Sequence, residues 1–304
     1  MSRRVAWPLL LTLAAGCTPP PGPPAVNAGP LKVATTTSII ADAVREIGGP
    51  AVEVTSLMPP GTDPHNYVPA TGDADTLASA HVVFFNGLHL EGKMTELLEH
   101  SRTIKAVAVS RTLTPADLRT VDGGSATDPH VWFDVKLWMR CVEVVRDELC
   151  AVDPGRAGTF RANATVYLAT LAMLDAEVIR KAAALPADRR VVVTSHDAFG
   201  YFARAYGFEV RGLQGVSTAA QTGSQDVTDL VAFIRTKRVP AIFTETSVPV
   251  RGLEKVLEST PGVKLVGDAE ALYSDSLGPA GSPGATYPGM VRHNIDTLVK
   301  YLGR

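Results

Sequence analysis

The chain has 304 residues, of which 45% are hydrophobic and 20% charged, as is ordinary for a soluble globular protein. This length is enough for one large domain or for two lobes that each bury a core. The formal net charge of −2 gives no reason to expect nucleic-acid binding, and the sequence has no long basic block.

A short basic and apolar segment opens the chain. Two arginines precede the run WPLLLTLAA, which ends at Gly16-Cys17 and is too short to span a bilayer comfortably. A cysteine after Ala-Ala-Gly resembles a bacterial lipobox, although Ala14 stands where leucine is usual. We therefore expect a lipoprotein signal peptide over 1–16, lipidation of Cys17 and a proline-rich tether over 17–30. A plain signal peptide with a coincidental cysteine is the alternative.

Short apolar strands alternate with helices from residue 31, which indicates a parallel sheet covered on both faces. Ser38 is the expected N-cap of the first helix. The pattern predicts an N-terminal lobe over 31–154. Its strands are expected at 32–36, 52–57, 82–86 and 106–109, and its helices at 38–47, 73–80, 91–100 and 135–149.

The longest periodic stretch is 155–184, where apolar residues recur at three- and four-residue steps. A helix of this length would extend ~45 Å, which exceeds what one lobe needs. We interpret residues 155–185 as a rigid connector between two lobes.

The alternation of strands and helices resumes after the connector and predicts a C-terminal lobe over 186–304. The expected fold is therefore α/β, with two lobes, each a mostly parallel sheet flanked by helices, joined by a long connector helix. Strands are expected at 190–194, 209–213, 241–245 and 263–266, and helices at 198–206, 226–237, 250–258 and 286–302.

Cys141 and Cys150 lie nine residues apart in or at the end of a predicted helix. Such a separation is ~13 Å, beyond the ~7 Å that a disulfide allows between α-carbons. We expect two buried free thiols, unless a kink near Asp153-Pro154 brings them together. No Cys-x-x-Cys pair occurs, which argues against a thiolate metal site.

The tripeptide Asp-Pro-His occurs twice, at 63–65 and at 128–130. Proline fixes one backbone dihedral and makes the preceding residue extended, so each histidine leaves its turn in a restricted direction. His196 ends the strand-like run VVVTSH, and Asp275 lies in the late loop LYSDSLG. Ligands of parallel sheets bind beyond the carboxyl ends of the strands. Imidazole and carboxylate suit Zn²⁺ and related ions, so we predict one metal site in the inter-lobe cleft, formed by His65, His130, His196 and Asp275.

Each candidate ligand also has a simpler interpretation. A lone loop histidine is usually a surface or hydrogen-bonding residue, and Asp275 beside serine could be a turn residue. We interpret the remaining four histidines as structural or solvated: His81, His89, His100 and His293.

Catalytic motifs are scarce. Ser195, His196 and Asp197 are consecutive, so their side chains cannot form a nucleophilic triad. No phosphate-binding loop, dinucleotide fingerprint or His-Glu-x-x-His pair occurs. Glu245, at the end of AIFTE, could act as a general base near a metal, but we favour a role in supporting a metal ligand or packing the lobes.

Six segments carry a resemblance to a known family: TTTSIIADAVREIGG, GTDPHNYVP, DPHVWFD, VTSHDAFGYFARAYG, IFTETSV and LYSDSLG. From about residue 31 to the C-terminus, the chain resembles the zinc- and manganese-binding solute-binding lipoproteins of bacterial ABC transporters, the TroA-like or cluster A-I group. The resemblance implies the two-lobed fold and the ligands His65, His130, His196 and Asp275.

The resemblance also bears on the metal. The third ligand of this family is histidine in many zinc binders and glutamate in many manganese binders, and here it is His196. The histidine-rich loop of many zinc members is missing, since 118–129 contains no histidine. Three imidazoles favour Zn²⁺, with Mn²⁺ as the alternative and iron as a further one.

We therefore expect an extracytoplasmic, lipid-anchored monomer that captures Zn²⁺ or Mn²⁺ and delivers it to the membrane permease and ATPase of an ABC transporter. This protein would not be an enzyme. The alternatives are a metallohydrolase with Glu245 as base and a surface adhesin that a metal stabilises.

Overall fold

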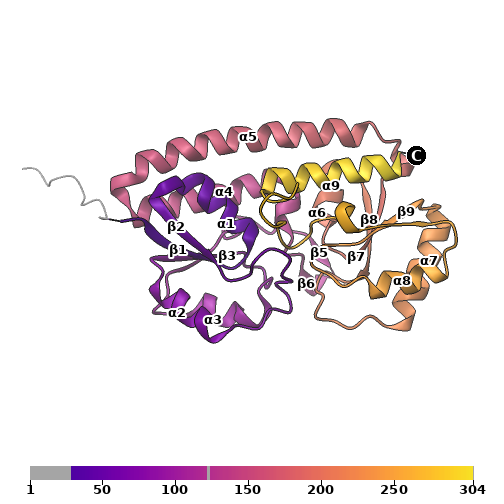
Figure 1. Ribbon diagram of the computed structural model, residues 1–304, viewed down its shortest axis with the longest axis horizontal. Coiled ribbons are helices and arrows are strands. Elements are labelled where there is room, and N and C mark those ends of the chain that lie inside the picture. Colours follow the sequence, from indigo (N-terminus) through magenta and orange to yellow (C-terminus); the bar gives the residue numbers. More distant parts are fainter. Residues whose placement is uncertain (1–28, 122–123, 304) are drawn as a thin grey trace, which may run out of the picture.

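A computed structural model describes residues 29–121 and 124–303. The predicted signal peptide, the predicted lipidation site Cys17 and most of the predicted tether lie outside these residues. Two α/β lobes lie side by side, and one long helix runs along both of them (Figure 1). The fold class predicted from the sequence is confirmed.

The N-terminal lobe contains a four-stranded parallel sheet in the order β2-β1-β3-β4. Strand β3 is buried along its whole length, with Val82 and Phe84 in one hydrophobic cluster and Val83 and Phe85 in another on the opposite face. Both faces are therefore covered, as the apolar strands predicted. The strands are β1 (Leu31–Thr35), β2 (Val52–Ser56), β3 (Val82–Phe85) and β4 (Ala106–Ala108), and the helices are α1 (Ser38–Gly48), α2 (Thr71–Ser79) and α3 (Thr95–His100).

The predicted cap of α1 is wrong by one residue. Thr37 is the N-cap, and its side chain accepts a hydrogen bond from the Ile40 N–H at 3.4 Å. The Ser38 hydroxyl instead accepts a hydrogen bond at 2.9 Å from the N–H of Leu277, in the loop that carries Asp275. The Ser38 hydroxyl, which the local sequence favoured as the helix cap, is therefore used in a tertiary contact.

The helix expected at 155–184 is α5 (Ala157–Ala183), whose 27 residues extend ~40 Å. It follows α4 (Val135–Val152) through a 3-10 turn at Pro154–Arg156. Cys141 and Cys150 both lie on α4 and are buried and free, as predicted. The segment Pro154–Ala183 is long and apolar enough to cross a membrane by length and composition alone.

The strands of the C-terminal lobe form two parallel pairs, β7 with β8 and β9 with β10. Strand β9 is shorter than predicted, because Glu245 forms an isolated bridge with Leu272 instead. A small antiparallel pair, β5 (Thr120–Val121) with β6 (Ala126–Thr127), lies in the predicted loop before His130. The other elements are β7 (Val191–His196), α6 (Gly200–Tyr206), β8 (Glu209–Gln214), α7 (Ser224–Lys237), β9 (Ala241–Phe243), α8 (Arg251–Glu258), β10 (Lys264–Val266) and α9 (Tyr287–Leu302).

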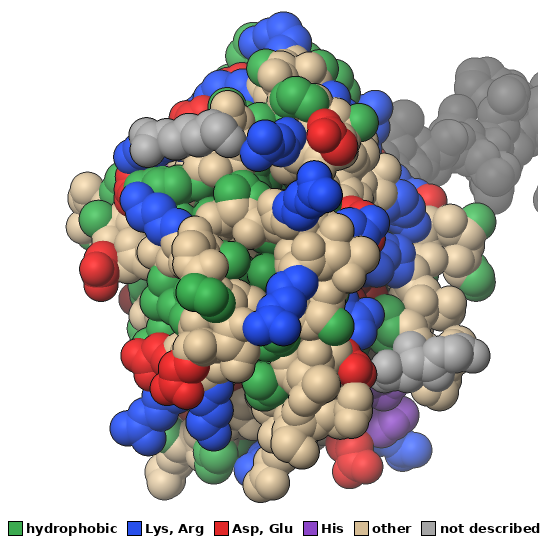
Figure 2. All heavy atoms as spheres, turned by 90° about the vertical axis from the view of Figure 1, so that its right-hand side faces the viewer, with side chains coloured by type: hydrophobic (Ala, Val, Ile, Leu, Met, Phe, Trp, Pro, Cys, Tyr) green, Lys and Arg blue, Asp and Glu red, His purple; other side chains and the backbone are tan. Residues whose placement is uncertain are grey.

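Basic side chains are dispersed over the end of the C-terminal lobe, with acidic and neutral ones among them (Figure 2). Some charges of this lobe are paired, such as Lys237 with Glu209 at 2.6 Å. This face therefore shows mixed charge and no single basic block.

One hydrophobic cluster is shared by the two lobes. It includes side chains of α1, α4, α5 and α9, among them Trp138, Leu171 and Leu298, which are all fully buried. Tyr287 strengthens this junction, since its N–H donates to Asp42 Oδ2 at 2.9 Å and its hydroxyl donates to the Trp132 carbonyl at 2.6 Å. One face of α5 is thus packed into a common core, while Val166, Met173 and Ile179 on the same helix are exposed.

We expect Leu171→Ala to lower the free energy of unfolding by about 2–5 kcal/mol, because Leu171 is 0% exposed and its truncation leaves a cavity in the shared core. Met173, two residues along the same helix, is 66% exposed, so Met173→Ala is the matched control and should have little effect. Urea denaturation of the metal-free protein measures both. Equal effects would contradict a packed connector.

Candidate metal centre

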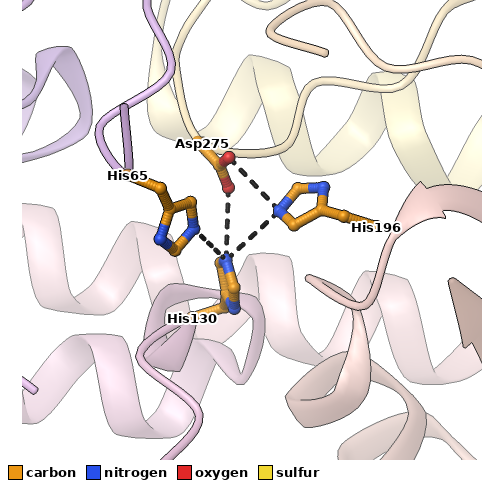
Figure 3. A group of neighbouring side chains, drawn as sticks. All are labelled: His65, His130, His196 and Asp275. Atoms are coloured by element: carbon orange, nitrogen blue, oxygen red, sulfur yellow. Dashed lines mark hydrogen bonds and ion pairs between the residues drawn. The ribbon is translucent and has the colours of Figure 1, made fainter. Parts of the chain in front are cut away.

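Four side chains converge where the lobes meet (Figure 3). Each of His65, His130, His196 and Asp275 offers one ligand atom, and these atoms lie within 4.8 Å of one another. His65 lies on the loop after β2, His130 follows β6, His196 is the last residue of β7, and Asp275 lies in the loop before α9. The structure thus brings together all four residues that the sequence singled out.

The three histidines present Nε2 to a common centre. The Nε2 atom of His130 lies 3.3 Å from that of His65 and 3.4 Å from that of His196. The two carboxylate oxygens of Asp275 lie 3.4 Å from His130 Nε2 and 3.3 Å from His196 Nε2. These separations exceed those of good N–H···O hydrogen bonds.

The centre is buried. His130 and His196 are 0% exposed, Asp275 is 1% exposed and His65 is 7% exposed. A buried carboxylate without good hydrogen bonds is costly, and one cation among these atoms would compensate it. Three nitrogen donors and one oxygen donor form a set that could hold one Zn²⁺ or a related ion.

The two Asp-Pro-His tripeptides fold in the same way. Asp63 Oδ1 accepts a hydrogen bond from the N–H of His65 at 2.9 Å, and Asp128 Oδ1 accepts one from the N–H of His130 at 3.0 Å. The sequence analysis attributed the direction of each histidine to the proline and missed this role of the aspartate. The presence of the same aspartate in both copies could have indicated it.

Asp128 also orients the His130 ring. Its Oδ1 lies 2.8 Å from His130 Nδ1, so the other ring nitrogen, Nε2, faces the centre. Arg119 pairs with the opposite oxygen of the same carboxylate, and the Tyr201 hydroxyl donates to the Asp128 carbonyl at 2.9 Å. Local sequence patterns contain no signal for Arg119 or Tyr201, which lie 9 and 73 residues from Asp128 along the chain.

Gly200 makes room for Arg119. A Cβ atom at Gly200 would lie 1.2 Å from Arg119 Nη1, so no other residue fits without displacing the guanidinium. Gly200 therefore supports the ion pair between Arg119 and Asp128 without touching the centre.

Glu245 contacts the backbone and the ring of His196, as Asp128 contacts those of His130. Its Oε1 accepts a hydrogen bond from the His196 N–H at 2.8 Å, and its Oε2 lies 2.6 Å from His196 Nδ1. Both oxygens therefore engage the histidine. This geometry suits the supporting role expected for Glu245 better than that of a general base.

Burial and neighbouring charges shift the pKa values of the three histidines in different directions. Burial lowers the pKa of His65 to about 4, despite the attraction of Asp275. Burial also acts to lower the pKa of His130, but contacts with Asp128 and Asp275 outweigh it and raise the pKa to about 9. For His196, Glu245 and Asp275 likewise outweigh burial and raise the pKa well above its ordinary value.

The Asp275 carboxylate interacts with the same histidines. Burial acts to raise its pKa, but His196 and His130 hold the pKa well below the usual range. In the metal-free centre the raised pKa values favour protons on His130 and His196, and the lowered pKa favours the ionised form of Asp275. A metal ion must displace these protons, because only a deprotonated nitrogen can bind it.

Two of the remaining histidines have ordinary structural partners. His81 Nδ1 accepts a hydrogen bond from the Lys32 N–H at 3.0 Å. His293 Nε2 lies 3.0 Å from the Ala271 carbonyl. Neither lies in the group of converging side chains.

The chain is similar to known metal-binding proteins in sequence and in fold. The family described as zinc-uptake complex component A, periplasmic (ZnuA), matches residues 33–301. The zinc-binding protein TroA of Treponema pallidum is 47% identical over 277 residues, covering 90% of this chain and 89% of that protein. The manganese-binding lipoprotein MntA of Bacillus subtilis is 43% identical and covers 90% of each chain. The solved structure of periplasmic TroA from Treponema pallidum matches with a TM-score of 0.87 and 46% identity, over 91% of this chain and 100% of that one.

We expect apparent Zn²⁺ affinity to rise with pH up to about 9, because the raised pKa keeps His130 protonated below that pH in the metal-free protein. The change should be about tenfold per pH unit for each proton released. Competition with a chelator of known affinity at each pH measures it. If His130 had an ordinary imidazole pKa of ~6.5, the apparent Zn²⁺ affinity would stay constant above about pH 7.5. That result would contradict the raised pKa of His130.

We expect Gly200→Ala to weaken metal binding by about tenfold, because the new Cβ displaces Arg119 and leaves Asp128 free to turn away from His130. Gly158 has open space around its Cβ position, so Gly158→Ala should leave affinity unchanged. The same chelator competition compares the two variants. Equal affinities would show that Arg119 does not help to orient His130.

Proposed function

The chain belongs to the family of periplasmic zinc-uptake components, and from this premise we propose that it captures one Zn²⁺ ion and delivers it to an ABC transporter for import. Mn²⁺ is the alternative cargo, since the relatives at 47% and 43% identity are named as zinc- and manganese-binding proteins respectively. The partner is the membrane permease with its ATPase.

The convergence of four ligand atoms from distant loops carries this proposal. We propose His65, His130, His196 and Asp275 as the ligands. Three neutral nitrogens and one carboxylate favour Zn²⁺ over Mn²⁺, which prefers more oxygen donors. We further propose that 31–154 and 186–304 act as the two metal-binding lobes, with 155–185 as their connector.

A carrier fits this centre better than a hydrolase. Catalytic zinc keeps one coordination position open for water, whereas four protein ligands complete a tetrahedral shell. Glu245 is engaged with His196 through both oxygens. Nothing in the site favours catalysis or adhesion.

The protein acts outside the cytoplasm at the membrane surface, in keeping with the relatives that are named as lipoproteins. We propose that Cys17 carries the lipid, that 17–30 tethers the lobes to the membrane, and that the carrier is a monomer.

Titration of metal-stripped protein tests the proposal. Calorimetry with residues 23–304 should show one equivalent of tightly bound Zn²⁺, and His196→Ala should lose it while the protein stays folded. His293→Ala is the control and should bind normally, because His293 bonds the Ala271 carbonyl away from the centre. Mn²⁺ is titrated separately, since Zn²⁺ outcompetes Mn²⁺ at most nitrogen and oxygen sites and metal content after purification is therefore ambiguous.

Three outcomes are informative. Stoichiometric Zn²⁺ binding by a protein that stays folded without metal supports a carrier. Unfolding on metal removal would indicate a structural metal instead. Failure to bind either ion in stoichiometric amounts would overturn the proposed function.

A further inference from the structure

Three polar side chains form a hydrogen-bonded group between the lobes beside His65. Thr218, on the loop between β8 and α7, donates from its hydroxyl to Asp63 Oδ2 at 2.6 Å. Asn66 donates from its amide to Asp63 Oδ2 and to Thr218 Oγ1, both at 2.9 Å. We call Asp63, Asn66 and Thr218 the cross-lobe latch. Two members flank His65 in the N-terminal lobe, and the third belongs to the C-terminal lobe.

The latch acts on His65 through a single carboxylate. Asp63 Oδ2 bonds the opposite lobe, while Asp63 Oδ1 accepts the N–H of His65 at 2.9 Å. A movement of the Thr218 loop is therefore passed to the backbone of a metal ligand through two consecutive hydrogen bonds.

His65 is held differently from the other two histidines. Asp128 and Glu245 lie against the Nδ1 atoms of His130 and His196 at 2.8 and 2.6 Å. Among residues 29–121 and 124–303, no carboxylate oxygen lies within ion-pairing distance of the His65 ring. His65 is also the most exposed of the four converging residues, at 7%. Its position thus depends on its backbone and on the loop that carries it.

Water reaches the latch from one side. A cavity of about 310 Å³ borders the group and is lined by Asp63, Asn66 and Thr218 together with Ser195 and Arg251, among others. Water can therefore take over the latch hydrogen bonds when the loop moves. The bonds of Asp128 and Glu245 are fully buried and lack this freedom.

A second tie keeps the start of the His65 loop in place. The N–H of Gly61 donates to the Ser276 hydroxyl at 2.6 Å. Loss of the latch would therefore loosen the loop around His65 without detaching it from the C-terminal lobe, so a latch variant should still fold.

We propose that Thr218 is a positioning residue that slows metal release by holding His65 against the other three ligands. This inference rests on the carrier function proposed above. The metal leaves when the Thr218 loop withdraws, since Asp63 then no longer fixes the backbone of His65.

Thr218→Val tests the inference, because valine keeps the volume and removes the donor. Mixing zinc-loaded protein with an excess of a chromophoric chelator measures the dissociation rate. We expect an increase of about tenfold, as a hydrogen bond to a charged group is worth a factor of this order or more. The association rate should change by less than about twofold, since most effects of a lost contact fall on dissociation. Thr218→Ser keeps the hydroxyl and should restore the slow rate.

Thr222 lies on the same loop, lines the same cavity and is exposed, so Thr222→Val is the matched control and should release zinc at the wild-type rate. Unchanged dissociation in Thr218→Val would overturn the role of the latch while leaving the carrier function intact. Equal acceleration in both variants would also overturn it, because general loop mobility would then control release. Failure of the wild-type protein to bind zinc would overturn both the carrier function and the latch.

Discussion

Asp275 is a buried carboxylate among three imidazoles where the two lobes meet, so its charge must be compensated there. Removing Asp275 from water costs several kcal/mol unless opposite charge compensates it, and Asp275 is only 1% exposed. In the metal-free protein the raised pKa values of His130 and His196 provide that charge as protons. A divalent cation among the four side chains would provide it instead. Metal and protons would then compete for the same buried nitrogens.

The protein orients its candidate ligands by two different means. Asp128 and Glu245 each accept a hydrogen bond from the backbone N–H of one histidine and place a carboxylate oxygen 2.8 or 2.6 Å from its Nδ1 atom, which leaves Nε2 facing the centre. Arg119 then pairs with the outer oxygen of Asp128. For His65, Asp63 accepts a hydrogen bond from the backbone N–H and lies against no ring nitrogen at ion-pairing distance among the described residues. Two ligands are thus rigidly supported, and one depends on a loop.

The shared hydrophobic core limits where movement can occur. Side chains of α1, α4, α5 and α9 pack in one cluster that reaches both lobes, so separating the lobes would expose core residues such as Trp138 and Leu171. Loops at the cleft carry no such penalty, since their contacts are hydrogen bonds that water can replace. This division matches a carrier whose scaffold survives empty while its loops admit and release the ion.

Local sequence patterns determined the elements of this fold and pointed to its centre. The 3.6-residue period over 155–184 predicted α5, and apolar runs such as VVFF predicted buried parallel strands. The repeated Asp-Pro-His and the position of His196 at a strand end indicated ligands before any contact was known. Only the tertiary structure showed that Thr37 and not Ser38 caps α1, that Arg119 pairs with Asp128 beside Gly200, and that Thr218 bonds Asp63. The reason is distance along the chain, because periodicity and turn chemistry depend on neighbours a few residues away. The hydrogen bond between Thr218 and Asp63 instead joins residues 155 positions apart and forms only once both lobes have packed.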